Sequence, residues 1–119
     1  MYRLASEHSS VREAWEIVSA DFSVGEAAVV GSKLGFYPDG AVDTELATFI
    51  YKAKRIEATC DNSLTYAAGD SVYDAGTPTG SVNKTSSAGR RLIGYALKAY
   101  PVGTETIEIE DFDGLRAVV

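Results

Sequence analysis

The chain has 119 residues, with 17 acidic side chains against 11 lysines and arginines and a formal net charge of −6 at pH 7. That length suits one domain with one core, and the negative charge argues against a protein that wraps phosphate backbones. A single cysteine, Cys60, excludes a disulfide within the chain, and no stretch has the apolar run of a signal peptide or a membrane span. Many glycines, valines, threonines and tyrosines favour short strands and tight turns, so we expect an all-β protein that works in water.

The first part of the chain predicts an arm followed by strands. Residues 1–12 carry few core-forming side chains, which favours a mobile N-terminal arm. Strands are expected at 13–18 and 27–30, with a turn at 21–25 between them. We therefore expect the arm and the first strand within residues 1–20 and one β domain over residues 21–119.

Residues 44–60 fit two structures. Six apolar side chains share one helical face at spacings of three or four: Leu46, Phe49, Ile50, Ala53, Ile56 and Cys60. The same stretch also alternates as a strand does, for example at 56, 58 and 60, and it is rich in residue types that favour strands. Propensity alone leaves helix and strand equally open here.

The second half of the chain predicts a hairpin and two more strands. Residues 71–74 and 80–83 flank a stretch rich in glycine and proline and form the expected hairpin. Residues 92–99 are mostly apolar, and their internal Gly94 indicates a central strand with a bulge or a close backbone approach. Residues 106–110 alternate isoleucine and glutamate, which is the pattern of a half-buried strand.

The side chains that most often perform catalysis are not arranged for it in this sequence. His8 is the only histidine, and it lies beside Ser6, Ser9 and Ser10 in the expected arm. A serine nucleophile needs a base that is held in place, which a mobile arm does not supply. We expect a solvated His8 and a protein that is not an enzyme.

Acidic side chains gather near the C-terminus, at Glu105, Glu108, Glu110, Asp111 and Asp113. Their spacing does not match an EF-hand loop, and the usual zinc-ligand spacings of cysteine and histidine do not occur in the sequence. Phosphate-binding glycine loops do not occur either. We expect these carboxylates to form a solvated strand face, with no metal and no cofactor.

Two small basic groups and several tyrosines are candidates for surface contacts. The basic groups are Lys52, Lys54 and Arg55, and Arg90 with Arg91. A solvated strand face is the favoured interpretation of both groups, and an interface with a partner is the alternative. Tyrosine combines apolar area with a hydroxyl group, so the core or a subunit contact is expected for Tyr66, Tyr73 and Tyr95.

Several short motifs follow one another in a characteristic order. They are V-G-E-A-A-V-V-G at 24–31 with L-G at 34–35, G-D-S-V-Y-D at 69–74, G-S-V-N at 80–83, and L-I-G-Y-A at 92–96 before I-E-I at 107–109. This order resembles a family of phage capsid cement proteins, long described as a domain of unknown function, whose members show G-x-x-V-Y-x-D, g-x-V-t and x-I-G-x-A. The match covers roughly residues 21–114 and depends on order and spacing.

The resemblance implies a compact β-barrel or β-tulip domain on the outer surface of a virion, made in the cytoplasm of a bacterial host. It implies binding to the major capsid protein, commonly as a homotrimer, which stabilises the head against the pressure of its DNA. It also favours strands over residues 44–60. We expect Trp15, Ile17, Arg90 and Arg91 to contact the capsid or a neighbouring subunit.

A function of another class is a carbohydrate- or receptor-binding module of a phage fibre. A sugar site of that kind needs aromatic side chains exposed together on one sheet face. Tyr66, Tyr73 and Tyr95 are the residues that would supply it. Nucleic acid and membrane are not expected as partners under either hypothesis.

Overall fold

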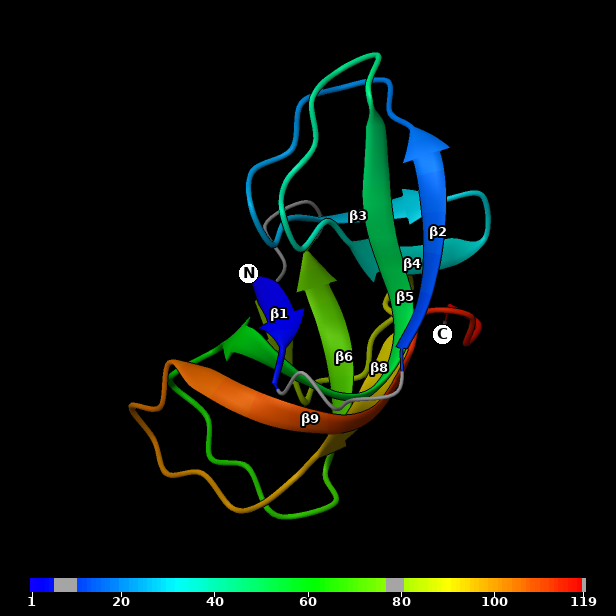
Figure 1. Cartoon of the computed structure of the whole chain (residues 1–119). Coiled ribbons are helices and arrows are strands. Elements are labelled where there is room, and N and C mark those ends of the chain that lie inside the picture. Colours follow the sequence, from blue (N-terminus) through cyan, green and yellow to red (C-terminus); the bar gives the residue numbers. More distant parts are fainter. Residues whose placement is uncertain (6–10, 77–80, 119) are drawn as a thin grey trace.

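A computed structural model describes residues 1–5, 11–76 and 81–118, and these residues form nine strands without a helix (Figure 1). The strands are β1 (Tyr2–Leu4), β2 (Val11–Ile17), β3 (Ala27–Val30), β4 (Lys33–Phe36), β5 (Leu46–Cys60), β6 (Ser71–Gly76), β7 (Ser81–Asn83), β8 (Leu92–Ala96) and β9 (Thr106–Asp113). The expected all-β fold is confirmed.

Five of the strands close into a barrel. β5 pairs with β7, β7 with β6, β6 with β8, β8 with β9, and β9 returns to β5. Closure of a sheet in this way removes the unpaired edges that an open sheet would present. The other four strands are added to β5, with β1 and β2 paired to it directly and the β3–β4 hairpin joined through β4. The compact barrel with added strands agrees with the expected fold class.

β5 is one strand of 15 residues, so the strand interpretation of residues 44–60 is the correct one. Its buried side chains do not alternate strictly along the strand, because Ala47 and Phe49 are followed by Ile50, Ala53 and Ile56. An irregularity in the pairing with β2 leaves one extra residue in β5 between positions 50 and 52. Such a bulge shifts which face a strand presents to the core, and it produces the spacing of three from Ile50 to Ala53 that imitates a helical face.

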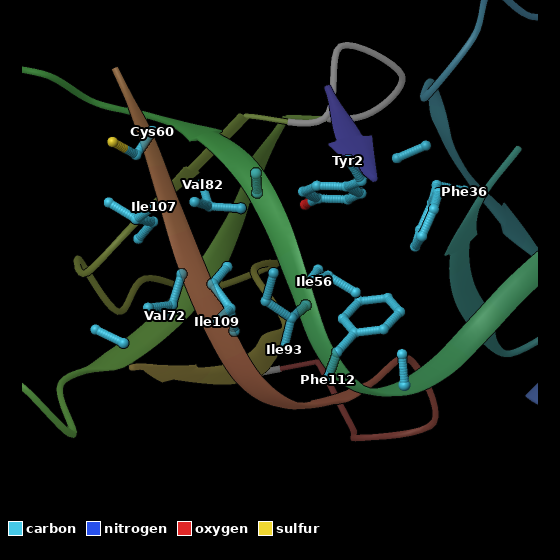
Figure 2. Close-up of a cluster of buried hydrophobic side chains, with 14 of the residues drawn as sticks. Tyr2, Phe36, Ile56, Cys60, Val72, Val82, Ile93, Ile107, Ile109 and Phe112 are labelled. Carbon is cyan, nitrogen blue, oxygen red and sulfur yellow. The ribbon is translucent and has the colours of Figure 1, made fainter. Parts of the chain in front are cut away.

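The main core fills the barrel and one of its ends (Figure 2). Three aromatic rings, those of Tyr2, Phe36 and Phe112, lie with their centroids 5.9 to 6.2 Å apart. The Tyr2 hydroxyl donates a hydrogen bond of 2.8 Å to Asp74 Oδ1, so its polar atom has a partner inside the protein. The aliphatic side chains around the rings come from β5, β6, β7, β8 and β9.

Tyr2 corrects the expectation that residues 1–12 contribute little to the core. Its side chain is completely buried, and β1 pairs with residues 56–58 of β5. Little in the sequence predicts this position, since a single tyrosine in a polar stretch becomes a core residue only through rings distant in sequence, such as Phe36 and Phe112. Residues 11 and 12 of the expected arm belong to β2, and residues 6–10 lie outside the described residues.

The hairpin and the two C-terminal strands are present where the sequence predicts them. β6 and β7 pair in antiparallel register, although residues 77–80 between them are not described. β8 ends at Ala96, earlier than expected, and a Cβ atom on Gly94 would lie 2.5 Å from Ile109 Cγ2, which confirms the close approach at this glycine. β9 buries Ile107 and Ile109, as the alternating pattern predicts.

A second, smaller core lies where β5 extends beyond the barrel. It contains Val18, Tyr37, Ala47 and Phe49, with partly buried neighbours from the surrounding loops. In this part of the molecule β2 runs antiparallel to the first half of β5 (Figure 1). We call these paired segments, residues 11–17 and 46–53, the β2–β5 ribbon.

Candidate binding surface

The outer face of the β2–β5 ribbon carries large apolar side chains. Trp15 is 62% exposed, Ile17 73% and Leu46 59%. In the antiparallel register Trp15 lies opposite Thr48, and Ile17 lies opposite Leu46. Side chains two residues apart on a strand, and those directly opposite on its neighbour, project from the same face. The three apolar side chains therefore form one patch, which we call the Trp15 patch.

The Trp15 patch borders a shallow depression of about 320 Å³ between the ribbon and the loop before β5. Trp15, Leu46 and Val42 contribute its apolar wall, and the Val42 side chain is itself exposed. Asp39 and Glu45 line it as well. The depression thus combines apolar side chains with two carboxylates.

The backbone of β2 is open along one edge, because within the described residues β2 pairs only with β5. Just after β2, the amide of Val18 donates to the Glu45 carbonyl at 3.1 Å, and its carbonyl accepts from the Thr44 amide at 2.9 Å. Backbone groups alternate in direction along an antiparallel strand. The N–H and C=O groups of Trp15 and Ile17 are accordingly directed away from β5, toward the open edge.

The negative charge of the protein is concentrated in the part of the chain that carries this patch. Residues 13–48 contain seven carboxylates and one lysine, Lys33, which gives them a net charge of −6. The rest of the chain contains ten acidic and ten basic side chains, so its charges balance. Residues 13–48 lie together in the upper part of the molecule in Figure 1, and we call them the acidic lobe. All of the net charge of the chain thus belongs to the acidic lobe.

Arg90 and Arg91 have different surroundings. The Arg91 side chain is buried, at 8% exposure, and its guanidinium donates to the carbonyls of Ser32, at 2.8 Å, and Gly114. Arg90 Nη1 donates to Asn83 Oδ1 at 2.8 Å. Arg91 is therefore an interior residue that joins two loops, which corrects its expected place at an interface.

The C-terminal acidic residues are mostly on the surface or in ion pairs. Asp113 lies 3.3 Å from Lys52 Nζ, and Asp111 lies 3.5 Å from Arg116. Partial burial alone would raise the pKa of Asp113, but the hydrogen bond from the Leu115 amide and the charges of Lys52 and Arg116 outweigh it, so the pKa is lowered. Within the described residues, no three carboxylate, cysteine or histidine side chains are grouped to hold a metal ion.

The three tyrosines of the sugar-binding hypothesis do not form one exposed platform. Tyr66 is buried, at 3% exposure, and its hydroxyl donates to the Asp61 carbonyl at 3.3 Å. Tyr73 and Tyr95 are half-buried on β6 and β8, and the Tyr95 ring is covered by the Arg116 guanidinium at 5.5 Å. The structure confirms a core position for Tyr66 and contradicts the shared surface that a sugar site would need.

Two further expectations concern other parts of the chain. His8, Ser6, Ser9 and Ser10 fall outside the described residues. Across the described ranges, no helix has the length and hydropathy needed to cross a membrane.

Trp15 and Ile17 were singled out by the sequence, whereas Leu46 and Val42 were not. Leu46 belongs to the apolar face expected for residues 44–60, and a leucine at that spacing is more often buried than exposed. The concentration of charge was visible in the sequence, as a running count of acidic and basic residues over 13–48 would have revealed it. A scan against models of known families, a search of curated proteins and a search of solved structures found no match to this chain.

Proposed function

We propose that this chain is a capsid cement protein, which binds the outer surface of a phage head and stabilises it against the pressure of the packaged DNA. The major capsid protein is then its partner, and three copies act together as a homotrimer on the shell. Such a protein works by binding energy, because contacts that span neighbouring capsomers must be broken before the capsomers separate.

The observation that carries the proposal is the Trp15 patch on the β2–β5 ribbon. Exposed clusters of large apolar side chains with a polar rim are typical of protein interfaces, and tryptophan is enriched where binding energy is concentrated. A tryptophan buries about 150 to 250 Å² when it is covered, so covering the exposed part of Trp15 contributes about 2 to 4 kcal/mol. A rigid barrel that presents one such patch suits a protein whose function is attachment.

The order of the sequence motifs supports the choice of capsid over other partners. The resemblance to the cement family covers the strands of the barrel and the β3–β4 hairpin, whereas Trp15 and Ile17 lie before it. Trp15 and Ile17 therefore lie outside the stretch shared with the family. In that part of the chain we expect contacts that are specific to one capsid.

The test is co-sedimentation of the purified protein with mature heads of its source virus from which this protein has been removed. We expect saturable binding at a copy number that matches the symmetry of the shell, and heads that resist heating better when the protein is bound. Failure to bind such heads would overturn the proposal.

The homotrimer is tested separately, by light scattering of the free protein and of protein released from heads. A chain of 12.7 kDa gives either that mass or three times that mass. If the number of copies bound at each equivalent position of the shell is not a multiple of three, the homotrimer is contradicted. The proposal that the protein binds the head is not affected by that result.

A further inference from the structure

We infer that the open edge of β2 accepts an extended, positively charged segment of a partner protein, which adds as a strand beside β2 and covers the Trp15 patch. The identity of that partner as the capsid protein rests on the proposed function, while the chemistry of the segment rests on the surface itself.

The backbone of β2 supports the addition of a strand. The N–H and C=O groups of Trp15 and Ile17 are directed to the open edge, and within the described residues β2 pairs only with β5. An exposed edge of this kind pairs readily with an extended peptide, whose main-chain hydrogen bonds supply affinity while its alternate side chains supply specificity.

The side chains of the same surface specify what the added strand carries. Glu13, Trp15 and Ile17 share one face of β2, and Asp39 and Glu45 border the depression beside them. Apolar side chains on one face of the added strand would cover Trp15 and Ile17. Lysine or arginine side chains nearby would meet the carboxylates, since charged groups at the rim of an interface attract complementary ones.

The charge of the acidic lobe argues against a second copy of this chain as the occupant. Pairing β2 with the β2 of another copy would bring two acidic lobes, each with a net charge of −6, next to each other. Like charges placed across an interface oppose association, most strongly at low salt. A basic partner removes this repulsion and replaces it with attraction.

Trp15 makes the inference measurable, because it is the only tryptophan in the chain and is largely exposed. The probe is a short capped peptide that repeats Lys-Thr-Val-Thr, so that lysine and valine lie on the same strand face, and the control is the same peptide with glutamate in place of lysine. At low salt we expect the lysine peptide to shift the Trp15 emission to shorter wavelength and to protect it from a neutral quencher. The glutamate peptide should do neither.

Two matched pairs of variants locate the contact. Glu45→Lys reverses a charge that lines the depression, and Glu105→Lys reverses the charge of another exposed glutamate, just before β9. The backbone carbonyls of both residues accept hydrogen bonds from other segments. We expect Glu45→Lys to weaken peptide binding about tenfold at low salt and Glu105→Lys to leave it nearly unchanged. Glu13→Pro removes an amide from the open edge, whereas Glu13→Ala removes only the side chain, so the proline variant should bind more weakly than the alanine variant.

The outcomes separate this inference from the proposed function. Equal effects of the two peptides on Trp15, no effect of either, or self-association through the patch detected by light scattering would overturn the inference. If the protein binds stripped heads while Trp15 remains accessible to the quencher, the cement function is supported and the addition of a strand beside β2 is contradicted. If the lysine peptide binds as expected and the heads do not, the surface is as inferred and the capsid is not its partner.

Discussion

Tyr2 joins the start of the chain to the barrel through two kinds of contact. Its ring packs against Phe36 and Phe112, and its hydroxyl bonds to Asp74 on β6. An apolar contact and a hydrogen bond made by one side chain can be separated by substitution. The position therefore tests whether β1 is part of the folded core.

We expect Tyr2→Phe to lower the free energy of unfolding by about 1 to 2 kcal/mol, because it removes a hydrogen bond from a buried site and keeps the ring. Tyr2→Ala should lower it by about 3 to 5 kcal/mol, because it also leaves a cavity between two aromatic rings. Urea unfolding of the three proteins measures both differences. A Tyr2→Ala protein as stable as the parent would show that β1 does not pack as described.

Deletion of the first twelve residues is a poor test of partner binding for the same reason. It removes Tyr2 together with the first two residues of β2, and so it would change stability and binding at once. Single substitutions on the ribbon separate the two effects.

The β2–β5 ribbon has two faces with opposite roles, and this difference is testable at the level of the strand pair. Trp15→Ala changes an exposed residue, and we expect it to alter the free energy of unfolding by less than about 0.5 kcal/mol. The same change should weaken binding to stripped heads about thirtyfold or more, which is the effect of losing the 2 to 4 kcal/mol estimated above for Trp15.

The matched control is Phe49→Ala, which truncates a completely buried ring on the inner face of the same ribbon. It should destabilise the protein by about 3 to 5 kcal/mol. A Trp15→Ala protein that binds heads as tightly as the parent would remove the ribbon from the interface.

The strands themselves show what the sequence can and cannot predict. Alternation in a short segment is a local property, so residues 106–110 and the hairpin of β6 and β7 were predicted correctly. β5 was ambiguous because the bulge opposite β2 breaks its alternation, and a bulge depends on the partner strand. The period of a strand is readable from sequence only where its pairing is regular.

The same limit applies to the candidate surface. Trp15 and Ile17 are predicted to make contacts because they belong to residues 1–20, which lie before the stretch that resembles the cement family. Arg91 was misplaced because the two carbonyls that bind its guanidinium belong to Ser32 and Gly114, which no local pattern connects to it. Local patterns identify which residues are unusual, and the fold decides whether they face a partner or the interior.

Three buried tyrosines link the stability of the whole molecule to pH. Burial, as the largest cause, raises the pKa of Tyr2, Tyr66 and Tyr100 above the ordinary value of 10.0, and the nearby Asp74 adds to the effect at Tyr2. When the pKa of a tyrosine is raised in the folded state, the unfolded chain loses that proton at a lower pH than the folded protein does. Its contribution to stability is therefore complete below pH 10 and declines as the pH rises above that value.

Burial also raises the pKa of the Cys60 thiol above its ordinary value of 9.0, so we expect the urea midpoint of unfolding to begin to fall above about pH 9 and to fall most steeply between pH 10 and pH 11. Tyr2→Phe should reduce the steepness of the fall above pH 10, because one of the three protected tyrosines is then missing. Tyrosine absorbance recorded in the same samples would show whether ionisation accompanies unfolding. A midpoint that does not change up to pH 11 would contradict the effect of burial on these side chains.

β5 also has a mechanical consequence. The strand runs without interruption from the ribbon into the barrel, where it pairs with β9 from Lys52 to Thr59 and with β1 from Ile56 to Ala58. A pulling force applied at the ribbon along the strand axis would load these ladders in shear, so many hydrogen bonds would have to yield together. The same force directed across the strand would break them one after another. The protein is accordingly strongest against tension that is parallel to β5, and the direction in which a partner pulls matters as much as how tightly it holds.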